Sequence, residues 1–176
     1  MNRGQYPTMG HRSPPLGPFT DHRPTFTVMR TNITGGSPYE PIIGFSRAVR
    51  VGNTVHLAGT GPVGADNEDA AGQTRRIFEI AIEALAKAGA TLDHVVRTRM
   101  FLTHVEDWEA VGHVHGEFLR TVRPAATMVV VAALLNPAWR IEIEFDAVIP
   151  GKGEGPGKEQ DSLLDSHFFD DYKLEP

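Results

Sequence analysis

Residues 123–134 read RPAATMVVVAAL, and residues 140–145 read RIEIEF. The first run has the length of a strand and is rich in β-branched residues, which predicts a strand buried on both faces. The second run alternates strictly, so Ile141 and the other apolar side chains face one way while Glu142 and the other charged ones face the opposite way. Pro137 lies between the runs and predicts a turn, since proline does not fit inside a central strand. Carboxylates beside an apolar strand make this pair the first place to look for a functional site.

The bulk composition narrows the class of protein. The chain has 176 residues, the size of one domain with tails, and a formal net charge of −5. A broad nucleic-acid surface would need clustered Lys and Arg, so we expect no nucleic-acid partner. The lack of cysteine excludes disulfides and thiolate chemistry and fits a reducing compartment. No apolar run approaches the roughly 20 residues that span a bilayer, and we expect a soluble, cytoplasmic protein without a membrane partner.

The chain divides into three parts. Residues 1–30 are rich in Pro and Gly without any periodicity, which predicts a flexible extension. Residues 31–150 form the predicted folded domain. Residues 151–176 begin with a Gly-rich linker and become acidic. Leucine and phenylalanine at helical spacing would allow this tail to dock on a partner, although a solvated acidic tail is the commoner meaning of such a segment.

Alternation of polar and apolar residues predicts α+β structure in the order ββαβαββ. The first two strands, 45–51 and 54–59, flank a two-residue Gly-Asn hairpin turn. A single apolar stripe predicts a helix over 68–88, capped by Asp66 or Asn67. The remaining predicted elements are a strand over 93–103, a helix from a capping box at 103–106 to Leu119 with Trp108 in its core stripe, and the two strands described first.

Two helices with one apolar stripe each cover only one face of such a sheet. The other face of the strand at 126–134 would then leave an apolar patch too large for a typical monomer. We therefore expect a closed, symmetric homo-oligomer.

Few residues point to chemistry by themselves. His113 and His115 are two apart on a helix and cannot chelate one ion, so no metal site is predicted. A packing role for His115 is commoner than acid–base catalysis. Glu142 and Glu144 share a strand face and make a candidate carboxylate pair, although a solvated sheet face is the commoner meaning. The Gly35-Gly36 and Gly59-Thr60-Gly61 stretches match neither the GxGxxG pattern nor the P-loop pattern, so nucleotide binding has little support.

Several blocks, taken in order, resemble the Rid family (RidA, also called YjgF) of small enamine and imine deaminases. The resemblance covers most of residues 39–149. Its blocks are Tyr39-Glu40-Pro41, 44–53, 58–60, 73–75, 89–90, 93–98, 123–125, 127–129 and 141–144.

The resemblance implies a chorismate-mutase-like α+β fold with two helices on one face, assembled as a homotrimer with small-molecule clefts between subunits. It implies hydrolysis of reactive enamines and imines to a 2-oxo acid and ammonia, without a metal or organic cofactor. Carried over by position, Glu142 would place the attacking water. Phe45 takes the place of a family Tyr near the first strand, and Gly59 matches the glycine after the second strand.

Ala126 is the main departure from the family pattern, because the family has an Arg there that grips the substrate carboxylate. Loss of two hydrogen bonds to a charged group, at roughly 1.5–3 kcal/mol each, would weaken carboxylate binding by orders of magnitude. Arg47, Arg99 or Arg140 are candidate replacements, and Met128 would line the cleft with Phe45. Three hypotheses follow: a divergent Rid-type hydrolase with a different substrate anchor, a non-catalytic binding or regulatory trimer, and an interaction scaffold that uses its tails.

Overall fold

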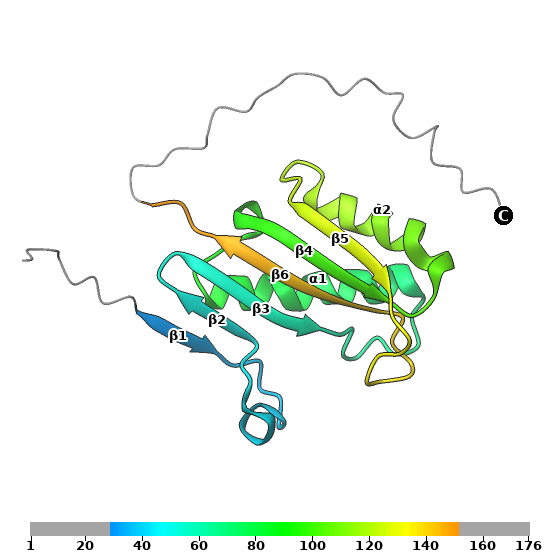
Figure 1. The fold of residues 1–176 in the computed structure, drawn as a ribbon, viewed down its shortest axis with the longest axis horizontal. Helices are drawn as coiled ribbons and strands as arrows, with labels where there is room; N and C mark the ends of the chain where they lie inside the picture. Colours follow the sequence, from blue (N-terminus) through cyan, green and yellow to red (C-terminus); the bar gives the residue numbers. More distant parts are fainter. Residues whose placement is uncertain (1–28, 152–176) are drawn as a thin grey trace, which may run out of the picture.

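The computed structural model describes residues 29–151, which form one six-stranded sheet with two helices behind it (Figure 1). The predicted extension over 1–30 and the tail over 151–176 lie almost wholly outside the described residues. The strands are β1 (Arg30–Ile33), β2 (Ala48–Val51), β3 (Thr54–Thr60), β4 (Val95–Leu102), β5 (Ala125–Val130) and β6 (Ile141–Val148). The helices are α1 (Ala70–Lys87) and α2 (Trp108–Leu119), with short helical turns at Glu40–Gly44, Leu92–His94 and Val105–Asp107.

The sheet has the strand order β1-β2-β3-β6-β4-β5, so β6 lies between β3 and β4. Neighbours are antiparallel except β4 and β5, which run parallel. The predicted order ββαβαββ is confirmed for its seven elements, but β1 was missed. Its four residues show no alternation, and only Ile33 is buried, so its sequence carries little strand signal.

The core lies between the sheet and the helices. The alternation predicted for β6 is confirmed, since Ile141, Ile143 and Phe145 are fully buried. The predicted stripe of α1 faces them, and the ring of Phe78 meets that of Phe145 edge-on at 5.5 Å. The N-cap of α1 is Asp69, whose side chain accepts a hydrogen bond from the Gly72 amide at 2.8 Å, rather than Asp66 or Asn67.

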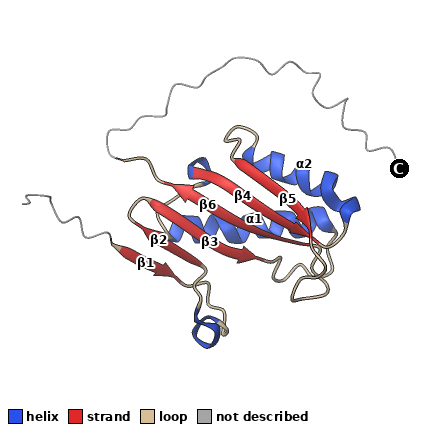
Figure 2. Ribbon diagram, viewed as in Figure 1, coloured by secondary structure: helices blue, strands red, loops and turns tan. Residues whose placement is uncertain are grey.

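Strand β5 differs from its prediction. It ends at Val130 and forms the edge of the sheet, with five of its six residues exposed rather than buried on both faces. Val129 and Val130 are 43% and 53% exposed. The apolar run predicts burial, but a single chain provides neither a further strand nor a full covering layer at this edge. The open face of the sheet in Figure 2 carries no helix.

The start of α2 also corrects the sequence analysis. The predicted capping box is not formed, and a 3-10 turn leads into the helix without a side-chain cap. Trp108 is 48% exposed instead of lying in the core, because the buried stripe of the helix runs through Val111 and Val114. A methyl group added at Gly112 or Gly116 would meet no atom within 4 Å, so close packing does not explain these glycines within one chain.

Candidate functional site

Glu142 projects from the open face of the central strand β6. It alternates with the buried residues Ile141 and Ile143 and lies opposite Phe101 of β4. Its side chain is half-buried. This burial raises the pKa of the Glu142 carboxyl, the negative charge of Glu144 raises it further, and the Arg47 charge opposes both effects. A carboxyl group with a raised pKa is suited to taking up and returning a proton near neutral pH.

Gly59 provides the space that the Glu142 carboxyl occupies. A Cβ built on Gly59 would overlap Glu142 Oε1 and lie 3.0 Å from its Cδ. The strand is irregular at this point: Leu57 pairs with Phe145 and Thr60 with Ile143, so β3 uses one residue more than β6. Such a β-bulge redirects side chains and is common beside active sites. The bulge brings the backbone of Gly59 against the carboxyl group.

Arg47 reaches the same glycine from the segment that leads into β2. Its guanidinium donates to the Gly59 carbonyl at 2.9 Å and to Thr60 Oγ1 at 3.0 Å. Burial lowers the pKa of the half-buried Arg47, whereas the negative charges of Glu40 and Glu142 raise it. Glu142, Gly59 and Arg47, all predicted site residues, therefore come together within one chain.

Arg99 and His56, on the same face of the sheet, are paired with carboxylates. Arg99 lies between two carboxylates, with its nitrogens 3.3 Å from Glu144 and 3.1 Å from Asp146. His56 Nδ1 lies 2.7 Å from the other oxygen of Asp146. The predicted carboxylate pair is thus unequal, because Glu144 is bound to Arg99 while Glu142 lies beside Gly59.

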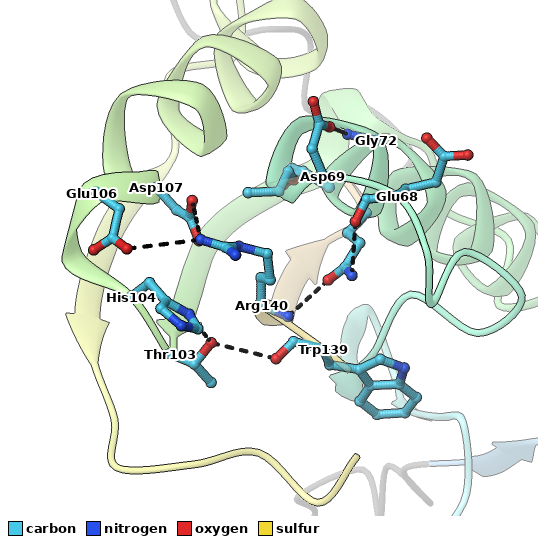
Figure 3. A network of polar contacts seen from close by, with 12 residues as sticks. Glu68, Asp69, Gly72, Thr103, His104, Glu106, Asp107, Trp139 and Arg140 are labelled. Atoms are coloured by element: carbon cyan, nitrogen blue, oxygen red, sulfur yellow. Dashed lines mark hydrogen bonds and ion pairs between the residues drawn. The ribbon is translucent and has the colours of Figure 1, made fainter. Parts of the chain in front are cut away.

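Arg140, at the end of the sheet, forms ion pairs with neighbouring carboxylates. Figure 3 shows its guanidinium directed at Asp107, with nitrogen–oxygen distances of 2.6 and 2.9 Å, and near Glu106 at 3.9 Å. Its backbone amide donates to Gln73, whose side chain in turn donates to Ala138 and Glu68. Of the three arginines named as replacements for the missing one at Ala126, only Arg47 lies beside Glu142.

Three predicted site residues lie on the helix side of the sheet. Ala126 pairs with Thr98, a buried residue whose hydroxyl lies 3.0 Å from His115 Nε2. Met128, two residues on, packs against the core. The His115 ring also meets Phe78 at 6.0 Å, and burial lowers its pKa. Within one chain the sheet separates these side chains from Glu142.

Phe45 lies at a shallow hollow of about 300 Å³ on the open side of β1, β2 and β3, together with Ala58 and His56. It is half-buried and close along the chain to Arg47. The sequence reasoning missed the bulge that shapes the site, although the isolated glycine in the Gly59-Thr60-Gly61 stretch is a recognised signal for one.

No three His, Asp or Glu side chains in residues 29–151 gather closely enough to hold a metal ion. Neither described helix has the length and apolarity needed to cross a membrane.

Comparisons with known proteins identify the family of this chain. A family model described as Endoribonuclease L-PSP matches residues 36–149. An uncharacterised protein of Streptomyces coelicolor is 37% identical over 119 residues, which are 65% of this chain and 89% of that protein. The 2-iminobutanoate/2-iminopropanoate deaminase of Dermatophagoides farinae is 35% identical over 122 residues, covering 62% of this chain and 89% of the deaminase. The 3-aminoacrylate deaminase RutC of Acinetobacter baylyi is 33% identical over 113 residues, covering 61% of this chain and 88% of the deaminase.

Among solved structures, Rv2704 of Mycobacterium tuberculosis, a member of the YjgF/YER057c/UK114 family, is 44% identical with a TM-score of 0.65. The match covers 69% of this chain and 100% of that one. The fold is therefore the chorismate-mutase-like α+β class, with an open sheet and two helices on one face. The chain belongs to the Endoribonuclease L-PSP family, which includes the YjgF and Rid proteins.

Proposed function

We propose that the protein is a Rid-type hydrolase that converts a small imine, or the enamine in equilibrium with it, to a carbonyl compound and ammonia. The observation that carries this proposal is the position of Glu142, half-buried against Gly59 with a raised carboxyl pKa. Two relatives that are 33% and 35% identical bear the names of deaminases of this kind.

In the proposed reaction, the Glu142 carboxylate accepts a proton from a water molecule as the water oxygen bonds to the imine carbon. The C=N π-electrons move to nitrogen, which takes up the proton that Glu142 removed from the water, and a carbinolamine results. The same carboxylate then accepts the proton of the carbinolamine hydroxyl and passes it to the amino group. The C–N bond breaks, ammonia leaves and the C=O bond forms. One water is consumed for each ammonia released, and no electrons are exchanged.

We further propose that the chain acts as a homotrimer with ligand clefts between subunits, in the cytoplasm. Support comes from the exposed β5 edge, with Val129 and Val130 lacking cover, and from the placement of Ala126 and Met128 away from Glu142 of their own chain. The absence of cysteine suits a reducing compartment. Light scattering on the full chain should give three times the monomer mass.

A non-catalytic binding protein of the same fold is the second candidate. The observation that favours it is Ala126, because a side chain without a guanidinium cannot hold a substrate carboxylate at that position. Tight binding of a metabolite without any turnover would support this alternative.

The test measures ammonia release above the uncatalysed rate, using 2-iminobutanoate and 2-iminopropanoate formed in situ by an amino acid oxidase. The Glu142→Gln variant should lose at least about 100-fold in kcat/KM, the usual contribution of a positioned general base. Glu144→Gln is the matched control, because it changes the same residue type two positions away on the same face, and it should stay within about threefold of wild type. Equal turnover by wild type and Glu142→Gln would refute the assignment.

A further inference from the structure

The three arginines named as replacements for the guanidinium missing at Ala126 differ in what they bind. Arg99 is held between Glu144 and Asp146, and Arg140 is held by both oxygens of Asp107. Arg47 instead bonds to two uncharged oxygens, the Gly59 carbonyl and Thr60 Oγ1. The first two guanidiniums have their charge compensated by direct ion pairs.

The guanidinium of Arg47 has N–H donors left for a ligand. It has five N–H donors, and the two named bonds use two of them. Thr60 Oγ1 donates its own proton to the Ala58 carbonyl at 2.9 Å, so it is fixed as an acceptor for Arg47. The bonds orient the planar group without neutralising it.

The loop that contains Gly35 packs against the aliphatic part of the Arg47 side chain. A Cβ on Gly35 would lie 3.1 Å from Arg47 Cβ. The nearby Glu40 carboxylate accepts hydrogen bonds from the Thr34 hydroxyl and the Gly35 amide, and these bonds chiefly lower its pKa. Glu40 is therefore bound within its own loop and leaves the guanidinium available.

We propose that Arg47 binds the carboxylate of the substrate, a small 2-imino acid, in place of the guanidinium that Ala126 lacks. This inference rests on the proposed hydrolysis at Glu142 and names the residue that anchors its substrate. A guanidinium suits the task because its planar fork matches both oxygens of a carboxylate.

The geometry links binding to chemistry. Arg47 and Glu142 meet at one residue, since the first bonds to the carbonyl of Gly59 and the second occupies the space above its Cα. In a 2-imino acid the C=N carbon is bonded directly to the carboxylate carbon. A carboxylate on Arg47 therefore places the reacting carbon near a water held by Glu142, and both groups come from the same subunit.

The experiment separates binding from turnover. Pyruvate and its uncharged amide, pyruvamide, are titrated into the full-length wild type, Arg47→Met, Arg47→Lys and Arg76→Gln, with binding followed by NMR. Arg76 serves as the matched control because it lies on the surface of α1, paired with Glu79. We expect Arg47→Met to weaken pyruvate binding by at least about tenfold, with a smaller loss in Arg47→Lys, and to leave pyruvamide binding unchanged. Thermal unfolding of each variant checks that the fold is kept.

The outcomes distinguish the two proposals. Loss of pyruvate binding in Arg47→Met, without imine turnover in the wild type, would keep the anchor and refute the hydrolase. Turnover that depends on Glu142, with equal pyruvate binding by wild type and Arg47→Met, would keep the hydrolase and overturn the anchor. Failure of wild type to bind pyruvate, or an equal loss of pyruvate and pyruvamide, would also overturn it. If Arg47→Met proves unfolded, the folded Arg47→Lys variant provides the test of the anchor. A preference for pyruvate over pyruvamide equal to that of wild type would then count against the anchor.

Discussion

At the scale of single residues, Gly59 determines where the Glu142 carboxyl can lie. A methyl group at this position would overlap Glu142 Oε1, so Gly59→Ala must push the carboxyl aside. A displacement of about 1 Å can lower a rate about 100-fold, and we expect a loss of that order in ammonia release. Gly112→Ala is the control, because a methyl there meets no atom within 4 Å. It should keep activity and stabilise α2 by up to about 1 kcal/mol. Full activity in Gly59→Ala would contradict the proposed site.

The raised pKa of Glu142 also predicts how stability depends on pH. Burial disfavours the charged form, so the folded protein binds this proton more tightly than the unfolded chain, whose carboxyl titrates near the ordinary value of 4.5. The contribution of the Glu142 carboxyl to the free energy of unfolding is fully present below pH 4.5. It is lost as the pH rises through the higher pKa of the folded state. Glu142→Gln should therefore be more stable than wild type at pH 8, and the gain should shrink towards pH 4. Urea unfolding at both pH values measures it, and a variant less stable at pH 8 would show that burial does not dominate.

The site residues were predictable to different degrees. Strict alternation in β6 placed Glu142 on the face opposite the core, and the family resemblance singled it out from Glu144. The bonds from Arg47 to Gly59 and Thr60 depend on the bulge in β3, which is a tertiary feature. Arg47 could be named as a candidate from sequence, but its distinction from Arg99 and Arg140 required their ion-pair partners.

At the scale of elements, the C-terminal end of α1 depends on Gly89. This residue has φ +78°, and a Cβ there would lie 2.7 Å from Arg50 Nη1, which bonds to the Ala88 carbonyl at 2.8 Å. Gly89→Ala should therefore lower the free energy of unfolding by roughly 1–3 kcal/mol, through backbone strain and displacement of Arg50. Gly36→Ala is the control for strain alone, since its φ is +80° and nothing lies within 4 Å. Chemical denaturation compares them, and equal costs would indicate that the Arg50 contact contributes nothing.

The elements that the sequence predicted well are those with a strong period and cover inside one chain. The stripe of α1 and the alternation of β6 meet these conditions, and both are buried as expected. Strand β5 has an apolar sequence but lies at an edge, where burial depends on what a neighbouring molecule supplies. The start of α2 was mispredicted because Asp107 binds Arg140, a contact distant in sequence, and the helix enters through a 3-10 turn instead of the capping box.

At the scale of the whole molecule, the question is whether one subunit supplies a complete pair of anchor and base. Arg47 and Glu142 meet at Gly59 of the same chain. We therefore predict that oligomers refolded from a mixture of Arg47→Met and Glu142→Gln subunits show no more activity than the mean of the two variants measured separately, because every subunit lacks one of the two groups. Ammonia release from 2-iminobutanoate measures the activity.

A second mixture supplies the reference for this experiment. Wild-type subunits refolded with the double variant Arg47→Met/Glu142→Gln should keep activity in proportion to the wild-type fraction, since each wild-type subunit has both groups. This result also shows that refolding itself does not destroy the site. Recovery of activity in the mixture of single variants would mean that Arg47 of one subunit serves Glu142 of another. Arg47 of one subunit and Glu142 of its neighbour would then face each other across a cleft between subunits. The Arg47 guanidinium would have to leave the Gly59 carbonyl of its own chain to reach that cleft.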